Sequence, residues 1–202
     1  MILPDHEIEA LIHRGVVRVP EGKTPLDLDL QLGPSSLDVR MSDEILLFET
    51  HAIHLVDVWD KRFPEMRKIK LDPKEGFVLH PGEFILGATM EIVNVPNDLV
   101  IRLEGRSSLG RLGLIIHATA GFIDPGFEGQ ITLEMQNIGR QPILIRPNQR
   151  IGQLCFQRMT SPARKSYSQK KDSKYTGQMG PTGSRLAQEK RNGDVVPQKR
   201  LE

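Results

Sequence analysis

The chain has 202 residues and a formal net charge of +1, from 27 basic and 26 acidic side chains; this balance excludes a general nucleic-acid or membrane binder, which would carry a marked basic excess. Its single cysteine, Cys155, excludes a disulfide framework and a cysteine-rich zinc site. Because there is no charged leader and no run of about 20 apolar residues, we expect a cytoplasmic protein.

The N-terminal segment LPDHEIEALIHRG predicts a short amphipathic helix. Its apolar residues Ile8, Leu11 and Ile12 recur at helical spacing, and the first turn is acidic. Gly15 is the expected stop.

Between Ser36 and about Arg158, short runs rich in β-forming residues alternate with turn signals such as Pro-Gly and Pro-Asn. This pattern predicts a mainly β fold: a sandwich, jelly roll or small barrel. The exception is residues 51–68, which have no clean period and are expected to form an irregular excursion. His51 and His54 in that segment are expected to be surface histidines, since no third metal ligand follows at a recognisable spacing. The predicted strands are LDVRM, EILLFE, FVLHPGEFILGATMEIV, LVIRLE, LGLIIH, QITLEMQN, PILI and RIGQLCFQ.

The composition turns polar and basic beyond Ser161, with ten Lys or Arg from Arg164 to the end against four Asp or Glu. Such a segment cannot bury enough surface to fold alone. We therefore expect a β domain over residues 1–160, an arm over 161–185 and a flexible polar tail over 186–202. The glycine-rich part of the arm, SKYTGQMGPTGSR, has the chemistry of a backbone that can wrap an anion.

The heptad GRSSLGR, residues 105–111, resembles two known motifs and matches neither. A nucleophile elbow would require glycine where Leu109 stands. A phosphate-binding P-loop would require Lys and then Ser or Thr where the chain has Arg111 and Leu112. Two readings remain: a loop whose arginines hold phosphate in bidentate fashion, or a charged turn between strands.

A Ser/His/Asp hydrolase built from Ser107 or Ser108, His117 and Asp124 is a further alternative, because such triads are recognised by geometry and not by order. His117 could equally be a satisfied core or interface histidine. Asp124 could be a turn aspartate that bonds to its own backbone.

Glu134 lies in QITLEMQN, where strand alternation places Ile131 and Met135 on one face and Thr132 and Glu134 on the other. If the second face meets solvent, Glu134 is an ordinary surface carboxylate. If that face lines a cleft, with Arg111 and Ser107 beside the carboxylate, Glu134 has what a general base needs.

Taken together, these segments resemble the dCTP deaminase and dUTPase superfamily, from Ser35 to about Arg185. Five motifs occur in the family's order: PSSLDVRM, EGRSSLGR, TAGFIDPGFEG, RIGQLCF and SKYTGQMGPTGS. The resemblance implies distorted jelly-roll subunits, a dUTPase-like β-barrel with a short N-terminal helix and an extended C-terminal arm. It also implies a homotrimer with sites at subunit interfaces, and deamination without zinc.

Glu134 distinguishes the branches, because dUTPases are usually apolar at this position. By resemblance, Glu134 deprotonates the water that attacks C4 of cytosine, and Ser107 and Arg111, with the Ala120 carbonyl, position that water. Asp124 accepts from the 3′-hydroxyl and Phe127 packs against the sugar. The other implied substrate-binding residues are Arg106, Ser108, Leu109, Gly110, Thr132, Leu133, Gln153, Tyr167, Lys174 and Gln178. Mg²⁺ would arrive with the triphosphate, with no direct protein ligand other than Asp38 as a candidate.

The TAGF string, with Ala120 and Gly121, resembles the bifunctional deaminases that continue to dUMP. A small Gly121 would let a second water and the α-phosphate approach near Asp124. The leading hypothesis is therefore conversion of dCTP to dUMP, diphosphate and ammonia. The alternatives are a deaminase that releases dUTP, a plain dUTPase, and a trimeric nucleotide-binding protein without catalysis.

Overall fold

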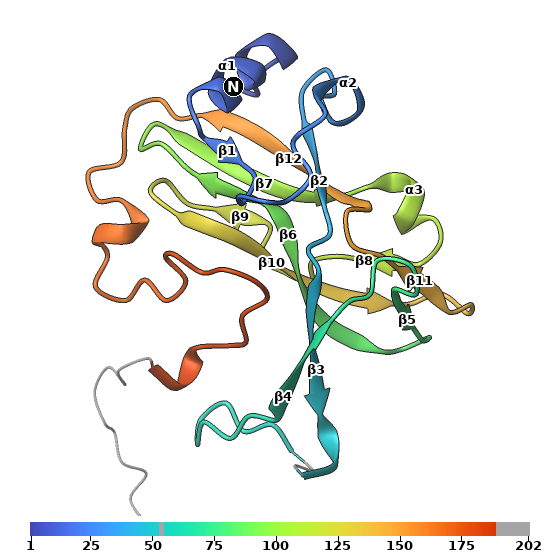
Figure 1. Cartoon of the computed structure of the whole chain (residues 1–202). Coiled ribbons are helices and arrows are strands. Elements are labelled where there is room, and N and C mark those ends of the chain that lie inside the picture. The colour runs from blue at the N-terminus through green and yellow to red at the C-terminus, as the bar shows by residue number, and fades with distance from the viewer. Residues whose placement is uncertain (53–54, 189–202) are drawn as a thin grey trace, which may run out of the picture.

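The structure is a computed structural model that describes residues 1–52 and 55–188 (Figure 1). Its first element is the predicted N-terminal helix, α1 (Asp5–His13), whose Ile8 is fully buried. Gly15, just beyond the helix, has a φ of 78°, a left-handed conformation that glycine adopts without strain. The predicted amphipathic helix is confirmed.

A six-stranded sheet forms the largest layer within the described residues. Its strands are β1 (Val17–Arg18), β3 (Glu44–Glu49), β4 (Glu65–Lys70), β6 (Phe84–Asn94), β8 (Leu114–Ile115) and β10 (Glu128–Asn137). They follow the order β4-β3-β6-β10-β8, and β1 also pairs with β6. β6 is buried at every position except its ends, and it lies between β3 and β10 in the sheet.

A second sheet, of four strands in the part of the chain described, packs against the first and shares one hydrophobic core with it. Its order is β2-β12-β7-β9. Its strands are β2 (Leu37–Arg40), β7 (Leu99–Gly105), β9 (Phe122–Ile123) and β12 (Arg150–Arg158), and a separate pair joins β5 (Phe77–Leu79) to β11 (Ile143–Ile145). The mainly β fold is confirmed. The sheets do not close into a barrel, because the outer strands β4 and β8 each pair with a single strand of the described chain.

The prediction that residues 51–68 form an irregular excursion is partly wrong, because residues 65–68 belong to strand β4. β4 pairs antiparallel with β3 over the full length of both strands, from Glu44 opposite Lys70 to Glu49 opposite Glu65. The hairpin projects from the body of the molecule (Figure 1). His51 is exposed beside Glu49, as expected of a surface histidine; His54 lies outside the described residues.

Two short α-helices and three 3-10 turns complete the described chain. They are α2 (Leu28–Gln31), α3 (Ser107–Gly110), η1 (Thr50–Ala52), η2 (Tyr167–Gln169) and η3 (Leu186–Gln188). The heptad GRSSLGR thus forms a helical turn rather than an extended loop.

A buried ion pair joins the two sheets. Arg40 on β2 donates from Nε to Glu91 Oε1 on β6 over 2.7 Å, and its backbone N–H donates to Oε2 over 2.8 Å. Gln31 also donates to Glu91 Oε1. Because neither charge is accessible to water, removing one partner would cost about 3–5 kcal/mol.

Residues 161–185 run outside the sheets as an arm and return across β10 (Figure 1). Tyr167 anchors the arm's first part: its N–H donates to the Pro125 carbonyl over 2.7 Å, and its ring packs edge-on against Phe127. Of the expected tail, residues 186–188 form η3 and residues 189–202 lie outside the described residues.

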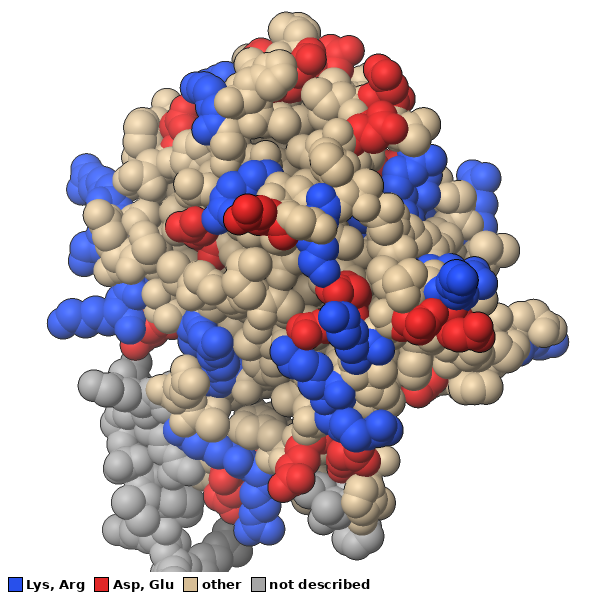
Figure 2. Space-filling view, viewed as in Figure 1, with Lys and Arg blue, Asp and Glu red and all other residues tan. Residues whose placement is uncertain are grey.

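The surface carries both signs of charge. Figure 2 shows Lys and Arg interspersed with Asp and Glu over the visible face, in agreement with the near-neutral composition. Within the described residues, no helix is both long and apolar enough to cross a membrane.

Candidate functional site

A cleft of about 1130 Å³ opens between β10, the loop before it, the β3–β4 hairpin and the C-terminal arm. Its hairpin side includes the apolar side chains of Val56, Val58 and Phe63, and Phe84 at the start of β6 also lines it. Val56 and Phe63 carried no sequence signal for this role, because residues 51–68 have no clean period. Seven of the predicted site residues line the cleft: Ala120, Asp124, Phe127, Thr132, Glu134, Tyr167 and Gln178.

Glu134 lies on the cleft side of β10. Leu133 and Met135 are fully buried and do not line the cleft, whereas Thr132 and Glu134 are half-buried and line it together with the edge of Ile131. Of the two readings of this face, the structure therefore supports the cleft. Glu134 Oε2 accepts a hydrogen bond from the Ala118 N–H over 2.9 Å, which holds the carboxylate in one orientation and leaves Oε1 for another partner.

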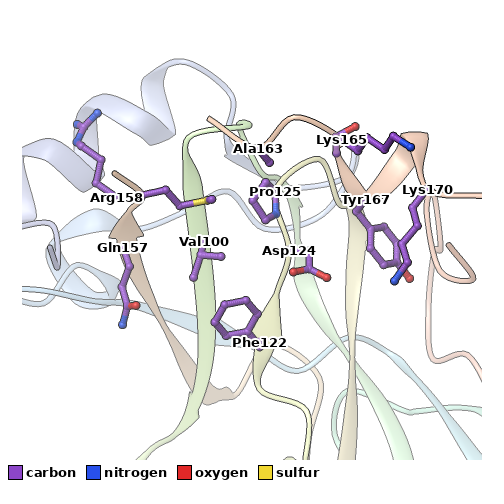
Figure 3. A pocket seen from close by; sticks show the side chains of 12 residues that line it. Val100, Phe122, Asp124, Pro125, Gln157, Arg158, Ala163, Lys165, Tyr167 and Lys170 are labelled. Carbon is purple, nitrogen blue, oxygen red and sulfur yellow. The ribbon is translucent and has the colours of Figure 1, made fainter. Parts of the chain in front are cut away.

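Asp124 and Tyr167 line both this cleft and a second, smaller cavity of about 440 Å³. In Figure 3 the Asp124 carboxylate lies between the rings of Phe122 and Tyr167, with the Lys170 side chain beside Tyr167. Lys165 lies on the same rim. The Asp124 carboxylate can accept a hydrogen bond from a hydroxyl, and the ammonium groups of Lys165 and Lys170 on the same rim can bind an anion.

The C-terminal arm brings Gln178 against β10 and holds Lys174 near Tyr167. Gln178 Nε2 donates to the Gln130 carbonyl over 2.7 Å. The Tyr167 hydroxyl accepts from the backbone N–H groups of Lys174 and Tyr175, each over 3.3 Å. Lys174 itself is not among the residues that line the cleft.

The GRSSLGR residues lie elsewhere. Ser107, Ser108, Gly110 and Arg111 are exposed on and just after α3, and neither they nor the half-buried Leu109 line the cleft. Figure 1 places α3 on the side of the body opposite the C-terminal arm. The expectation that Ser107 and Arg111 flank Glu134 is therefore not met within one chain.

Asp38 anchors a second group of predicted residues. Its Oδ2 lies 3.1 Å from Arg106 Nε and 3.2 Å from Arg150 Nη1, and nearby Gln153 accepts from the Ser36 hydroxyl. Two guanidinium groups neutralise the carboxylate, so Asp38 does not fit a direct Mg²⁺ ligand. Arg150 carried no sequence signal; it meets Asp38 because β12 pairs with β2.

Two further predicted residues act through the backbone. Leu133 is fully buried, so only its peptide groups can face the cleft edge of β10. The Gly121 carbonyl oxygen accepts a hydrogen bond from the Leu103 N–H over 2.7 Å, and a Cβ on Gly121 would lie 2.6 Å from the Leu103 carbonyl oxygen. The small size of Gly121 is therefore required by packing against β7, and not only by space for a ligand.

We expect Gly121→Ala to destabilise the fold by about 1–3 kcal/mol, because the added methyl group meets a backbone atom that cannot turn away. The measurement is the free energy of unfolding in urea. Gly110→Ala is the matched control, since a Cβ there meets nothing within 4 Å. Equal stability of the two variants would contradict the packing argument.

Comparison with known proteins places this geometry in one family. The model of the dCTP deaminase-like family matches residues 2–159. A relative from Beutenbergia cavernae named "dCTP deaminase, dUMP-forming" is 48% identical over 92% of this chain and 94% of its own length. A relative of the same name from Streptomyces coelicolor is 48% identical over 92% of this chain and 95% of its own.

Among solved structures, the 2′-deoxycytidine 5′-triphosphate deaminase from Agrobacterium tumefaciens is similar to this chain, with a TM-score of 0.60 and 26% identity. The match covers 77% of this chain and 47% of that one, so it spans about half the length of the solved chain.

Proposed function

The chain belongs to the dCTP deaminase-like family, and we propose that it converts dCTP to dUMP, diphosphate and ammonia. The observation that carries the proposal is the position of Glu134, a carboxylate that lines the cleft and is oriented by the Ala118 N–H. A plain dUTPase would leave this residue without a role. The dUMP-forming names of relatives at 48% identity support the second half of the reaction.

Deamination needs a base beside C4 of cytosine. We place the pyrimidine along β10, so that Glu134 takes a proton from a water whose oxygen bonds to C4. N3 takes up that proton from Glu134, the proton of the new C4 hydroxyl passes through Glu134 to the amino nitrogen, and the C4–N bond breaks, so that ammonia leaves and the C4 carbonyl of uracil forms. General base catalysis by a positioned carboxylate contributes about 10²- to 10⁴-fold to such a step.

The sugar and phosphates then extend toward Asp124 and the arm. Asp124 accepts from the 3′-hydroxyl, and Phe127 packs against the deoxyribose, where it leaves little room for a 2′-hydroxyl. A second water attacks the α-phosphorus, the bond from that phosphorus to the bridging oxygen breaks, and diphosphate leaves. The cationic rim with Lys170 and the arm's Lys174 suit this end of the substrate.

The site is incomplete in one chain. Ser107 and Arg111 are exposed and lie away from the Glu134 of their own chain, so we place them in the cleft of a neighbouring copy within a homotrimer. Arg106, Ser108 and Gln153 would come with them, to meet phosphates. Mg²⁺ enters as part of the triphosphate substrate, since Asp38 is already neutralised by arginines. A protein that acts on such a nucleotide is expected in the cytoplasm.

Product analysis tests the proposal. Incubation with dCTP and Mg²⁺ is expected to yield dUMP, diphosphate and ammonia in equal amounts, resolved by chromatography and an ammonia assay. Free dUTP without diphosphate would show a deaminase that stops after the first step. Hydrolysis of dUTP with no ammonia from dCTP would show a plain dUTPase, and tight binding without turnover would show a nucleotide-binding protein.

A further inference from the structure

The C-terminal arm docks on a free edge of β10. Within residues 1–52 and 55–188, one edge of β10 is paired with β6, whereas the other is paired with β8 only at Gln136 and Asn137. At the opposite end of this second edge, the Gln130 N–H donates to the Gln178 carbonyl over 3.0 Å, and the Gly177 N–H donates to the Glu128 carbonyl over 2.7 Å. The arm thus extends the sheet by a short parallel segment.

The backbone of the arm lies close to the backbone of β10. Gly129, on β10 beside the arm, has a φ of 146°, and a Cβ there would lie 2.7 Å from the Gln178 carbonyl oxygen. Only glycine accommodates this contact without displacing the arm. The local sequence of β10 therefore permits docking, but backbone pairing alone leaves the register of the arm free to slip by one residue.

Side-chain contacts restrict that register: the Gln178 amide and the Thr132 hydroxyl bond across the same edge, and the Gln130 side chain adds a buried contact. Gln130 is 5% exposed, its Oε1 accepts from the Gly180 N–H over 2.6 Å, and its Nε2 donates to the Met90 carbonyl over 3.2 Å. One buried amide thus ties the arm to two strands, β10 and β6. Loss of that amide would leave a buried N–H and a buried carbonyl without partners, which is costly.

Gln130 does not line the cleft, so it cannot act on a ligand directly. The arm that it holds carries Gln178, which lines the cleft, and Lys174, which is bonded to Tyr167. We propose that Gln130 is a positioning residue: its amide helps to fix the register of the arm on β10 and thereby sets the affinity of the site for the triphosphate. This inference rests on the proposed function for its ligand, but not for the docking itself.

Hydrogen–deuterium exchange of the nucleotide-free protein tests the docking. In Gln130→Leu, exchange over residues 176–185 is expected to rise about tenfold or more, the size of change expected when a hydrogen bond is lost and buried groups are left unpaired. Exchange over β6 should stay unchanged. Gln136→Leu is the matched control, a half-buried glutamine at the other end of the same strand, where β10 pairs with β8. Unchanged exchange in the arm, or an equal rise in β6, would overturn the inference.

Gln130→Glu provides the conservative variant. Its side chain keeps an acceptor oxygen for the Gly180 N–H, and its protonated form, favoured by burial, also keeps a donor for Met90. We expect arm exchange closer to the wild type than in Gln130→Leu. If Gln130→Leu does not fold, a fall in the protection factors of the arm in Gln130→Glu, relative to the wild type at the same pH, as the pH rises supports the inference, and protection equal to the wild type at every pH contradicts it.

Steady-state kinetics tests the consequence for the site. Gln130→Leu is expected to raise KM for dCTP about tenfold and to change kcat about twofold at most, because Glu134 and its orientation are untouched. A fall in kcat with an unchanged KM would contradict a role through the arm. If the wild-type protein does not turn over dCTP, the proposed function fails, while the exchange result still decides the role of Gln130.

Discussion

Glu134→Gln is expected to lower kcat for dCTP deamination by about 10²- to 10⁴-fold, the contribution of a positioned general base. The dissociation constant for dCTP should change little, because the amide has nearly the same shape as the carboxylate. Its carbonyl oxygen can also still accept from the Ala118 N–H, so the loop that carries Ala118 should keep its place. The measurements are ammonia release in single-turnover conditions and dCTP binding by calorimetry.

Glu128→Gln is the matched control for this variant. Glu128 is a carboxylate on the same strand, but it is exposed, pairs with Arg18 and does not line the cleft. Its substitution should leave deamination within about twofold of the wild type, since exposed ion pairs contribute little. Wild-type deamination by Glu134→Gln would refute the assignment of the base, and loss of dCTP binding would point to a role in binding rather than in proton transfer.

Hybrid oligomers are expected to recover activity from two inactive variants. Arg111→Ala alone should lose about 10²-fold or more, because a cation that stabilises developing charge is removed from the site. When Arg111→Ala and Glu134→Gln subunits are co-expressed in equal amounts, a cleft with an intact Glu134 can meet a neighbour with an intact Arg111. In a ring of identical interfaces, about a quarter of the sites would then be complete.

The control for complementation is a pair of variants from the same cleft. Glu134 and Asp124 line one cleft of one chain, so mixing Glu134→Gln with Asp124→Asn subunits leaves every cleft defective and should restore nothing. Differently tagged subunits allow the hybrids to be purified before assay. If the Arg111→Ala mixture also stays inactive although hybrids form, the proposal that Arg111 acts in a neighbour's cleft is wrong.

Much of the β framework could be predicted from local pattern. The alternation of QITLEMQN placed Leu133 in the core and Glu134 on the opposite face, because successive side chains of a strand point to opposite sides. The strand at residues 65–70 was not predicted, because it lacks such an alternation. Its charged sequence has no apolar face of its own, and it is a strand because it pairs with β3 along its length.

For the candidate site, too, the residues could be predicted from the sequence but their arrangement in space could not. The residue types of Glu134 and Asp124 left their roles open, and the resemblance to the family supplied the prediction of a nucleotide site. Which of the predicted residues share a cleft could not be read from their order, and Ser107 and Arg111, expected beside Glu134, lie elsewhere in the chain's own fold.

The sequence by itself determined the mainly β class, the N-terminal helix, the family and the chemical groups available to the site. The β class, the helix and the chemical groups follow from periodicity and residue type, which are properties of short segments, whereas the family follows from the resemblance of five ordered motifs. Only the tertiary structure decided the Arg40–Glu91 pair, the contact that requires Gly121, and the Gln130 amide that holds the arm. Each of these joins segments far apart in the chain, and a contact between distant segments exists only once packing has chosen which strands become neighbours.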